Sequence, residues 1–257
     1  MADAKNHFLT SFLQTLIVLA VLVFAWQVCI WIFQPARFLF PSPLDVARVF
    51  QTQSSYLASN ALITINEMVL GFIIGSSIGV FVALVLSQFP MLDRYLMPIV
   101  VTTQTLPVFA IAPLLVIWFG FGIGSKIVMA SLIIFFPVAS AFYDGLKQTP
   151  RTWLDLGANW GASKFQLLGL MRIPAAMPSL ITGLKVAATI APIGAIVGEW
   201  AGAAGGLGFV MLQANARTQT DVVFASLIVL AFCAFFLRWI VVHCADYFLW
   251  WSREAST

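Results

Sequence analysis

The stretch RTWLDLGANWGASKFQLLGLMRIP, residues 151–174, separates two long apolar segments and decides the fold. Within it, Trp153, Leu156 and Trp160 fall at helical spacing and predict one apolar stripe on a short helix. Gly161 follows the stripe directly, and a glycine permits the sharp turn that would end such a helix. The stretch therefore predicts a hinged helical segment between two membrane spans.

The second half of this stretch predicts another short helix, from Lys164 to about Met171, with Ser163 as its N-terminal cap. Pro174 and Pro178 are expected to close the region before the next span. Exposed apolar groups outside a bilayer have to be covered. Two alternatives stay open: the two short helices pack on the ends of the chain's own spans, or they fit a groove in a soluble partner.

Composition places the whole chain in a membrane. Of its 257 residues, 61% are apolar and 9% are charged, against roughly a quarter charged in ordinary soluble domains. This excludes a soluble enzyme, a disordered chain and a nucleic-acid-binding domain. The three cysteines all lie in apolar runs, which favours small core residues over a disulfide framework or a metal site.

Six segments are long and apolar enough to cross a bilayer, which takes about 20 residues. The expected fold is therefore an all-α, polytopic transmembrane helix bundle. No repeat or low-complexity tract interrupts the chain, so residues 1–257 are expected to form a single domain. The predicted spans are Phe12–Phe33, Glu67–Ser87, Leu96–Phe119, Lys126–Tyr143, Pro178–Trp200 and Val222–Trp250.

Six spans place both termini on one side, and the distribution of basic residues indicates the cytoplasmic side. Residues 144–173, which contain the hinged segment, then lie in the cytoplasm as well. The cytoplasmic segments hold Lys5, Arg94, Lys147, Arg151, Lys164, Arg172 and Arg253, and the outer segments hold Arg37, Arg48, Lys126 and Arg217.

The longest outer segment, Gln34–Asn66, contains an amphipathic stretch at Leu44–Leu57. Small residues recur at helical spacing in two of the spans. Gly71, Gly75 and Gly79 predict a flat helix face for close packing. The similar face of the fifth span has three possible roles: a dimer seam, a transport pathway or a contact within the chain.

Polar side chains inside apolar spans are costly and mark candidates for a pathway or gate. Gln104 is one candidate, since an amide cannot readily satisfy itself within a helix. Glu67 and Glu199 are expected near the outer ends of their spans, either solvated or paired at the interface. Alternatively, Glu199 forms an outer gate with Trp200 and the flexible loop 202–208, which would be followed by a short re-entrant helix over 209–217.

We identify no catalytic or metal site in the sequence. The glycine cluster at 120–126 has its Ser and Lys in the wrong order for a phosphate loop. His243, Cys244 and Asp246 are too close in sequence to converge on one ion. An intramembrane enzyme would need catalytic groups at one depth, and an ion-gradient-driven transporter would need midplane acids or an inverted repeat. Neither pattern is found.

The loop resembles the EAA loop of permease subunits of ATP-binding-cassette (ABC) importers. That pattern is Glu-Ala-Ala, Gly four positions later, and Ile-x-Leu-Pro after nine more residues. This chain keeps the spacing with Asp155-Leu156-Gly157, Gly161 and Met171-Arg172-Ile173-Pro174. The clearest departure is Leu156, which is larger than the alanine of the pattern.

Further stretches resemble the branch that serves sulfonates, taurine, nitrate and pyrimidine precursors of thiamine. The resemblance covers about residues 38–250 and is carried by the stretches at 40–43, 113–120 and 194–199. It favours the pyrimidine group through Gly198-Glu199-Trp200 and residues 213–217.

The resemblance implies the type I importer permease fold in a bacterial inner membrane, embedded in lipid. It implies two permease copies, a cytoplasmic ATPase pair that carries ATP and Mg²⁺, and a periplasmic substrate-binding protein. It assigns no cofactor, enzymatic activity or nucleic acid to this chain. The coupling segment to the ATPase would comprise Asp155, Leu156, Gly157, Ala158, Gly161, Ala162, Ser163 and Pro174.

Overall fold

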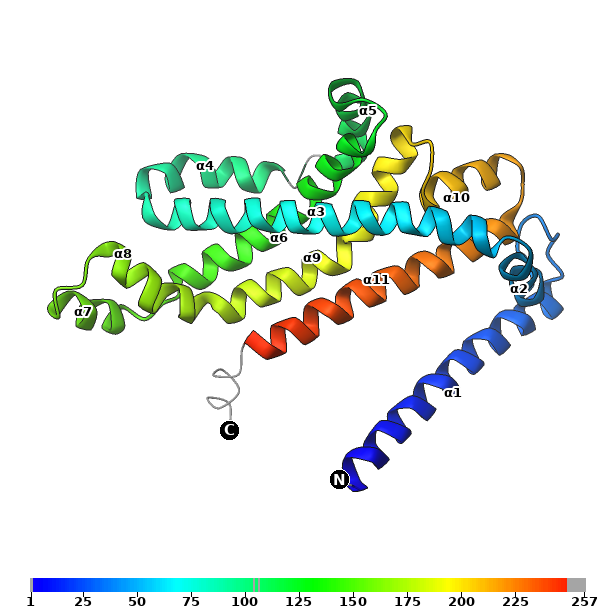
Figure 1. Cartoon of the computed structure of the whole chain (residues 1–257), viewed down its shortest axis with the longest axis horizontal. Coiled ribbons are helices and arrows are strands. Elements are labelled where there is room, and N and C mark those ends of the chain that lie inside the picture. Colours follow the sequence, from blue (N-terminus) through cyan, green and yellow to red (C-terminus); the bar gives the residue numbers. More distant parts are fainter. Residues whose placement is uncertain (1, 104, 106, 249–257) are drawn as a thin grey trace. The chain divides into compact units, whose positions relative to one another are not determined.

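The computed structural model describes residues 2–103, 105 and 107–248, and every regular element in this part of the chain is a helix. Figure 1 follows these elements along the chain. They are α1 (Ala2–Phe33), α2 (Pro43–Thr52), α3 (Ser54–Gln88), α4 (Pro90–Thr103), α5 (Val108–Phe119), α6 (Ile123–Lys147), α7 (Arg151–Asn159), α8 (Lys164–Leu167), the π-helical segment η1 (Leu168–Arg172), α9 (Ile173–Gly202), α10 (Leu207–Ala216) and α11 (Thr220–Phe248).

Four helices in the described part are long and apolar enough to cross a membrane: α3, α6, the continuous helix Lys164–Gly202, and α11. Helices α4 and α5 form a fifth span if the pair, bent by 98°, is counted as one. Within α1, the part Ile17–Phe33 is apolar but shorter than these spans. The predicted all-helical membrane bundle is confirmed, and the number six stays a prediction.

The chain divides into two compact units, one comprising residues 1–58 and 210–228 and the other residues 59–209 and 229–257. In the larger unit, α6 packs against both α3 and α9. A Cβ added at Gly71 of α3 would lie 2.4 Å from the Ala130 Cβ of α6, and one at Gly79 would lie 2.7 Å from the Phe135 carbonyl oxygen. The predicted glycine face is therefore a packing surface of α3.

The small-residue face of α9 also packs within the chain. A Cβ added at Gly183 would lie 2.9 Å from the Pro137 carbonyl oxygen, and one at Gly194 would lie 2.7 Å from the Ala130 Cα. Since lipid tails are as apolar as these helix faces, close backbone approach supplies much of the packing energy. At these two positions the observed role of the face is contact with α6.

The smaller unit has its own core around the predicted amphipathic stretch. Val46 and Val49 of α2 are buried with Val210 and Ala214 of α10. The amphipathic prediction is confirmed, but α2 ends at Thr52 and α3 begins at Ser54, so the stretch is split between two helices. The rings of Trp26, Phe40 and Phe224 pack beside this core, with centroids 5.5–5.9 Å apart.

A capping box begins α2. The Ser42 hydroxyl accepts a hydrogen bond from the Asp45 amide at 3.1 Å and donates one to the Asp45 carboxylate at 2.6 Å. Pro43, whose ring presets a helical φ, occupies the first turn. The hydrogen bond from the Ser42 side chain lowers the pKa of Asp45 below its ordinary value of 3.8, with help from Arg37 and Arg48.

Candidate functional site

The predicted apolar stripe lies on α7 and its C-cap residue, and its side chains stay about half or more exposed in the described part of the chain. Trp153 is 52% exposed, Leu156 48% and Trp160 79%. In the described part of the chain, the ends of the spans therefore leave about half or more of each stripe side chain exposed. An exposed aromatic and aliphatic row on a short helix is the surface that a partner groove would bury.

The turn after α7 is a Schellman motif. The Gly161 amide donates to the Ala158 carbonyl at 2.9 Å, and the Ala162 amide donates to the Gly157 carbonyl at 3.0 Å. Gly161 has φ +77°, a left-handed conformation that glycine adopts without a steric penalty. The predicted break at Gly161 is confirmed, and the turn fixes the direction in which the chain leaves α7.

Ser163 caps the next helix as predicted, through a capping box with Gln166. The Gln166 side chain accepts from the Ser163 amide at 2.8 Å, and the Ser163 hydroxyl accepts from the Gln166 amide at 3.3 Å. The predicted short second helix is wrong, however. From Lys164 the chain continues as one helix to Gly202.

The prolines that were expected to close the cytoplasmic region lie inside this continuous helix. Pro174 occupies the first turn of α9, and Pro178 lies further along it. A proline clashes with the carbonyl four residues upstream in a regular α-helix. The wider π segment Leu168–Arg172 ends two residues before Pro174 and contains the carbonyl four residues upstream of it, so that local geometry is changed. The second half of the loop and the span therefore form one continuous helical rod, Lys164–Gly202.

Gly157 fixes the distance between α7 and this rod. It is buried, and an added Cβ would lie 2.4 Å from the Leu167 Cδ2 and 2.9 Å from the Met171 Cε. The large Leu156 is tolerated beside it because its side chain points outward. Of the remaining predicted coupling residues, Ala162 is half-buried, and the exposed ones are Asp155, Ala158, Ser163 and Pro174.

At the other end of the rod, Glu199 anchors the loop that follows α9. The residue is 1% exposed, so of the two predicted alternatives, a solvated or a paired carboxylate, the solvated one is wrong. Its carboxylate accepts a hydrogen bond from the Thr64 hydroxyl at 2.6 Å and another from the Gly208 amide. The neighbouring Trp200 donates its indole N–H to the Gly208 carbonyl at 3.1 Å.

Two more bonds hold the same loop to α3. The Gly206 amide donates to the Asn60 side-chain oxygen at 2.8 Å, and the Leu207 amide donates to the Thr64 hydroxyl at 2.8 Å. Loop 202–208, expected to be flexible, is therefore tied down. Gly206 has φ +107°, and an added Cβ would lie 2.3 Å from the Glu199 carboxyl group, so only glycine fits there.

Sequence reasoning missed Lys126, which was assigned to an outer segment. The residue lies in the first turn of α6 and is 2% exposed. Its ammonium donates to the Phe121 carbonyl, to the Gly122 carbonyl at 2.8 Å and to the Gly202 carbonyl at 2.9 Å. A cation at the C-terminal end of α9 is favoured by the helix dipole. The end of α9 and the loop after it are thus bonded to α3 through Asn60 and Thr64, and to α6 through Lys126; these residues and Glu199 form a polar cluster.

Glu67 joins this cluster from α3, with Glu199 and Lys126 as its charged neighbours. It was predicted to open its span, but α3 begins at Ser54, about 20 Å earlier along the helix. Its Oε2 is buried and makes no hydrogen bond within the described part of the chain. Gln104, the other pathway candidate, lies outside the described residues.

The comparisons with known proteins agree with this geometry. The chain belongs to the family described as binding-protein-dependent transport system inner membrane components, whose model matches residues 53–246. A probable ABC transporter permease of Haemophilus influenzae is 43% identical over 238 residues, which cover 93% of this chain and 97% of that protein. The expected resemblance to ABC importer permeases is confirmed.

Two further relatives belong to the predicted branch. The formylaminopyrimidine transport permease ThiX of Halalkalibacterium halodurans is 35% identical, covering 76% of this chain and 78% of ThiX. The taurine permease TauC of Escherichia coli is 29% identical, covering 86% and 82%. A chain of the MetNI methionine ABC transporter, in an inward-facing conformation, shares the fold with a TM-score of 0.66 and 18% identity, covering 75% and 95%.

Proposed function

We propose that this permease subunit of an ABC importer forms its pathway with a second copy of the same chain. A separate pair of ATPase subunits binds ATP and Mg²⁺ and drives the transport, while a periplasmic binding protein delivers the solute. The observation that carries this proposal is the rigidly mounted, exposed stripe Trp153, Leu156 and Trp160. A helix held by a Schellman turn and bearing an uncovered apolar row is suited to a groove in the ATPase.

The mechanism follows from the continuous rod Lys164–Gly202. At 1.5 Å per residue its 39 residues span about 58 Å. A movement of α7 is passed to the rod through the Gly157 contact, and the rod ends at the Glu199 cluster. Nucleotide-driven movement at one end would therefore reposition the anchored loop at the other as a rigid body.

Glu199 and Trp200 are proposed to anchor an outer gate. Both bond to Gly208, so the loop follows the end of α9 when that helix moves. Three backbone amides, those of Gly206, Leu207 and Gly208, donate to buried side-chain acceptors, and these bonds resist local opening. Gln104 is retained as a proposed pathway residue.

The proposed cargo is a pyrimidine precursor of thiamine. The 35% identity to a formylaminopyrimidine permease supports it, against 29% for the taurine permease. The alternative cargo for the same machinery is a sulfonate, taurine or nitrate. A more remote alternative is a transporter driven by an ion gradient, which would take up solute without ATP.

The proposed function is tested by uptake into vesicles that contain the permease, its ATPase and its binding protein. With ATP inside, labelled formylaminopyrimidine is expected to accumulate and taurine is not. The Gly161→Trp variant forces a bulky side chain into φ +77° and should abolish uptake. Gly169→Trp is the control, since Gly169 lies in open space at an ordinary φ.

Uptake that persists in Gly161→Trp would contradict the coupling role. Accumulation of taurine in place of the pyrimidine would show that the cargo belongs to the alternative class of sulfonates, taurine or nitrate. Accumulation without ATP under an imposed ion gradient would favour the remote alternative.

The proposed topology places both termini in the cytoplasm, as the basic residues of the loops indicate. Reporter domains fused to the N- and C-terminal ends should both report the cytoplasmic side. A periplasmic signal from either fusion would contradict the proposed orientation.

A further inference from the structure

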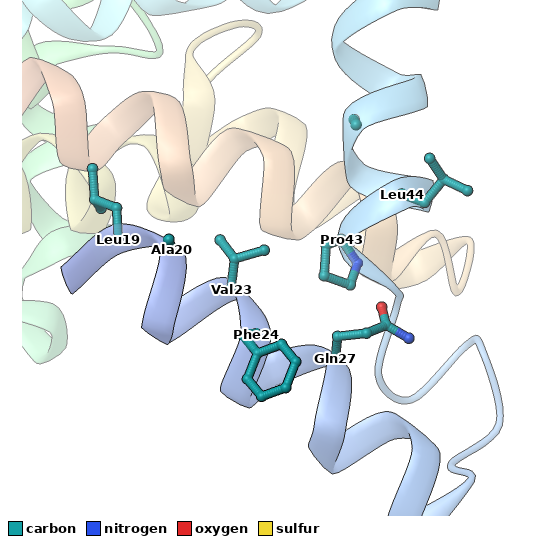
Figure 2. Close-up of a pocket in the computed structure, with 8 residues that line it drawn as sticks. Leu19, Ala20, Val23, Phe24, Gln27, Pro43 and Leu44 are labelled. Carbon is teal, nitrogen blue, oxygen red and sulfur yellow. The ribbon is translucent and has the colours of Figure 1, made fainter. Parts of the chain in front are cut away.

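A preformed apolar groove lies between α1 and α2, within the smaller unit. Its volume is about 760 Å³, within the range of small-molecule sites. Figure 2 shows the two walls, with labelled side chains from α1 on one side and from α2 on the other. The apolar lining residues that carry the argument are Leu19, Val23 and Phe24 of α1, and Pro43, Leu44 and Ala47 of α2.

The two walls are fixed to one another. The Trp26 indole N–H donates to the Pro41 carbonyl at 3.1 Å, which ties α1 to the segment just before α2. The Trp26 ring also packs against Phe40, with centroids 5.9 Å apart. The Ser42 capping box holds the first turn of α2 on the same segment. The groove is therefore part of the fold of this unit.

The groove continues into a polar hollow of about 420 Å³, and Gln27 lines both. The hollow is lined by Trp31, Gln34, Arg37 and Asp45 among others. Along α1 the lining side chains thus change from apolar to polar, and the exposed Trp31 lies where this change occurs. Tryptophan is enriched at this level of a membrane, where apolar and polar regions meet.

One cation and one carboxylate, Arg37 and Asp45, line the hollow, and the cation is the group available to a ligand. The Arg37 guanidinium is exposed and makes no hydrogen bond or short ion pair with another described residue. The Asp45 carboxylate is already engaged, since it accepts from the Ser42 hydroxyl and lies 3.6 Å from Arg48. The free guanidinium has the fork geometry that binds phosphate oxygens in pairs.

We propose that the α1–α2 groove holds an acyl chain of an anionic phospholipid, whose phosphate binds Arg37. The groove residues Leu19–Gln27 belong to the apolar helix Ile17–Phe33, so hydrocarbon is the medium around them. An apolar trough joined to a polar hollow with an unpaired cation matches an amphiphile with a negative head. A second copy of the chain would cover the trough but would leave Arg37 without an anion.

The test uses the full-length permease in complex with its ATPase, in phosphatidylcholine vesicles. The probe is phosphatidylglycerol with a photoreactive diazirine on one acyl chain, and the labelled peptides are identified by mass spectrometry. Labelling is expected in residues 19–27 and 43–47. Ala47→Trp fills the groove and should lower this labelling about tenfold, while Ala58→Trp, at an exposed position outside the groove, should not.

The head-group assignment is tested in the same assay. Arg37→Gln should lower labelling by phosphatidylglycerol about tenfold, because the charge-assisted hydrogen bonds to the phosphate are lost. Arg48→Gln removes a neighbouring cation that does not line the hollow and should leave labelling unchanged.

Two results would overturn the proposal. One is labelling that Ala47→Trp and Arg37→Gln leave at the wild-type level. The other is efficient cross-linking between two copies through Val23→Cys, in a background without the native cysteines, which would show that a second chain fills the groove.

Discussion

Removing the Glu199 carboxylate should release the loop that it anchors. In Glu199→Ala, the Gly208 amide loses its acceptor, and the Thr64 hydroxyl loses its short bond and keeps only the Asn60 carbonyl at 3.3 Å. Hydrogen bonds to a charged group contribute about 1.5–3 kcal/mol each. The free energy of local opening of loop 203–208 should therefore fall by about 3–6 kcal/mol.

Amide hydrogen exchange of Leu207 and Gly208 measures this opening directly. Since 1.4 kcal/mol corresponds to a factor of ten, exchange should accelerate by about 10²–10⁴-fold in Glu199→Ala. Trp200→Phe is the matched control. It removes one neutral bond to the Gly208 carbonyl, worth about 1 kcal/mol, and should accelerate exchange about fivefold.

The reasoning would be refuted if exchange in Glu199→Ala stayed within twofold of the wild type. It would also be refuted if Trp200→Phe accelerated exchange as much as Glu199→Ala. Either result would mean that the carboxylate does not hold the loop.

Three further perturbations test other contacts. Gly157→Leu should push α7 away from the Leu167 side chain and weaken ATPase binding at least about tenfold, measured by co-purification. Lys126→Met removes the donor to three carbonyl oxygens and should lower the free energy of unfolding by about 3–5 kcal/mol in denaturant titration. Asp45→Asn should reduce the loss of thermal stability in acid. Because the folded pKa of Asp45 lies below its ordinary value of 3.8, its ionised form stabilises the fold above that pH, and the contribution is lost as the pH falls through the folded pKa.

Each of these variants has a control or a contradicting result. Asn159→Leu adds the same side chain at an exposed position of α7 outside the predicted coupling residues and should leave ATPase binding at the wild-type level. Unchanged stability of Lys126→Met would show that the ammonium does not hold the end of α9. An identical acid profile for Asp45→Asn and the wild type would contradict the role of the capping box.

The fold class and the hinge were predictable because they depend on local signals. The length of each apolar run predicts a span. The left-handed turn at residue 161 favours glycine, and a glycine is visible there in the sequence. The continuation of the rod through Pro174 was not predictable in this way. A π turn leaves no clear signal in sequence, and it overrides the usual boundary at a proline.

The polar cluster around Glu199 was missed for a different reason. Its members Asn60, Thr64, Lys126 and Glu199 are far apart in sequence, and each alone is compatible with an ordinary interfacial position. Lys126 was assigned to the outside because a lysine near a span boundary is usually solvated. The hydrogen bond from the Gly208 amide to Glu199 had one usable signal, a carboxylate followed closely by a glycine-rich loop.

The central claim is that the α7 stripe is the surface through which an ATPase moves this subunit. A photo-cross-linking residue at Trp160, in the transporter assembled with its ATPase, tests it most directly, with the exposed Phe89 on the α3–α4 turn as the control position. Cross-linking to the ATPase is predicted from position 160 and not from position 89. No cross-link from position 160, or equal cross-linking from both positions, would contradict the claim.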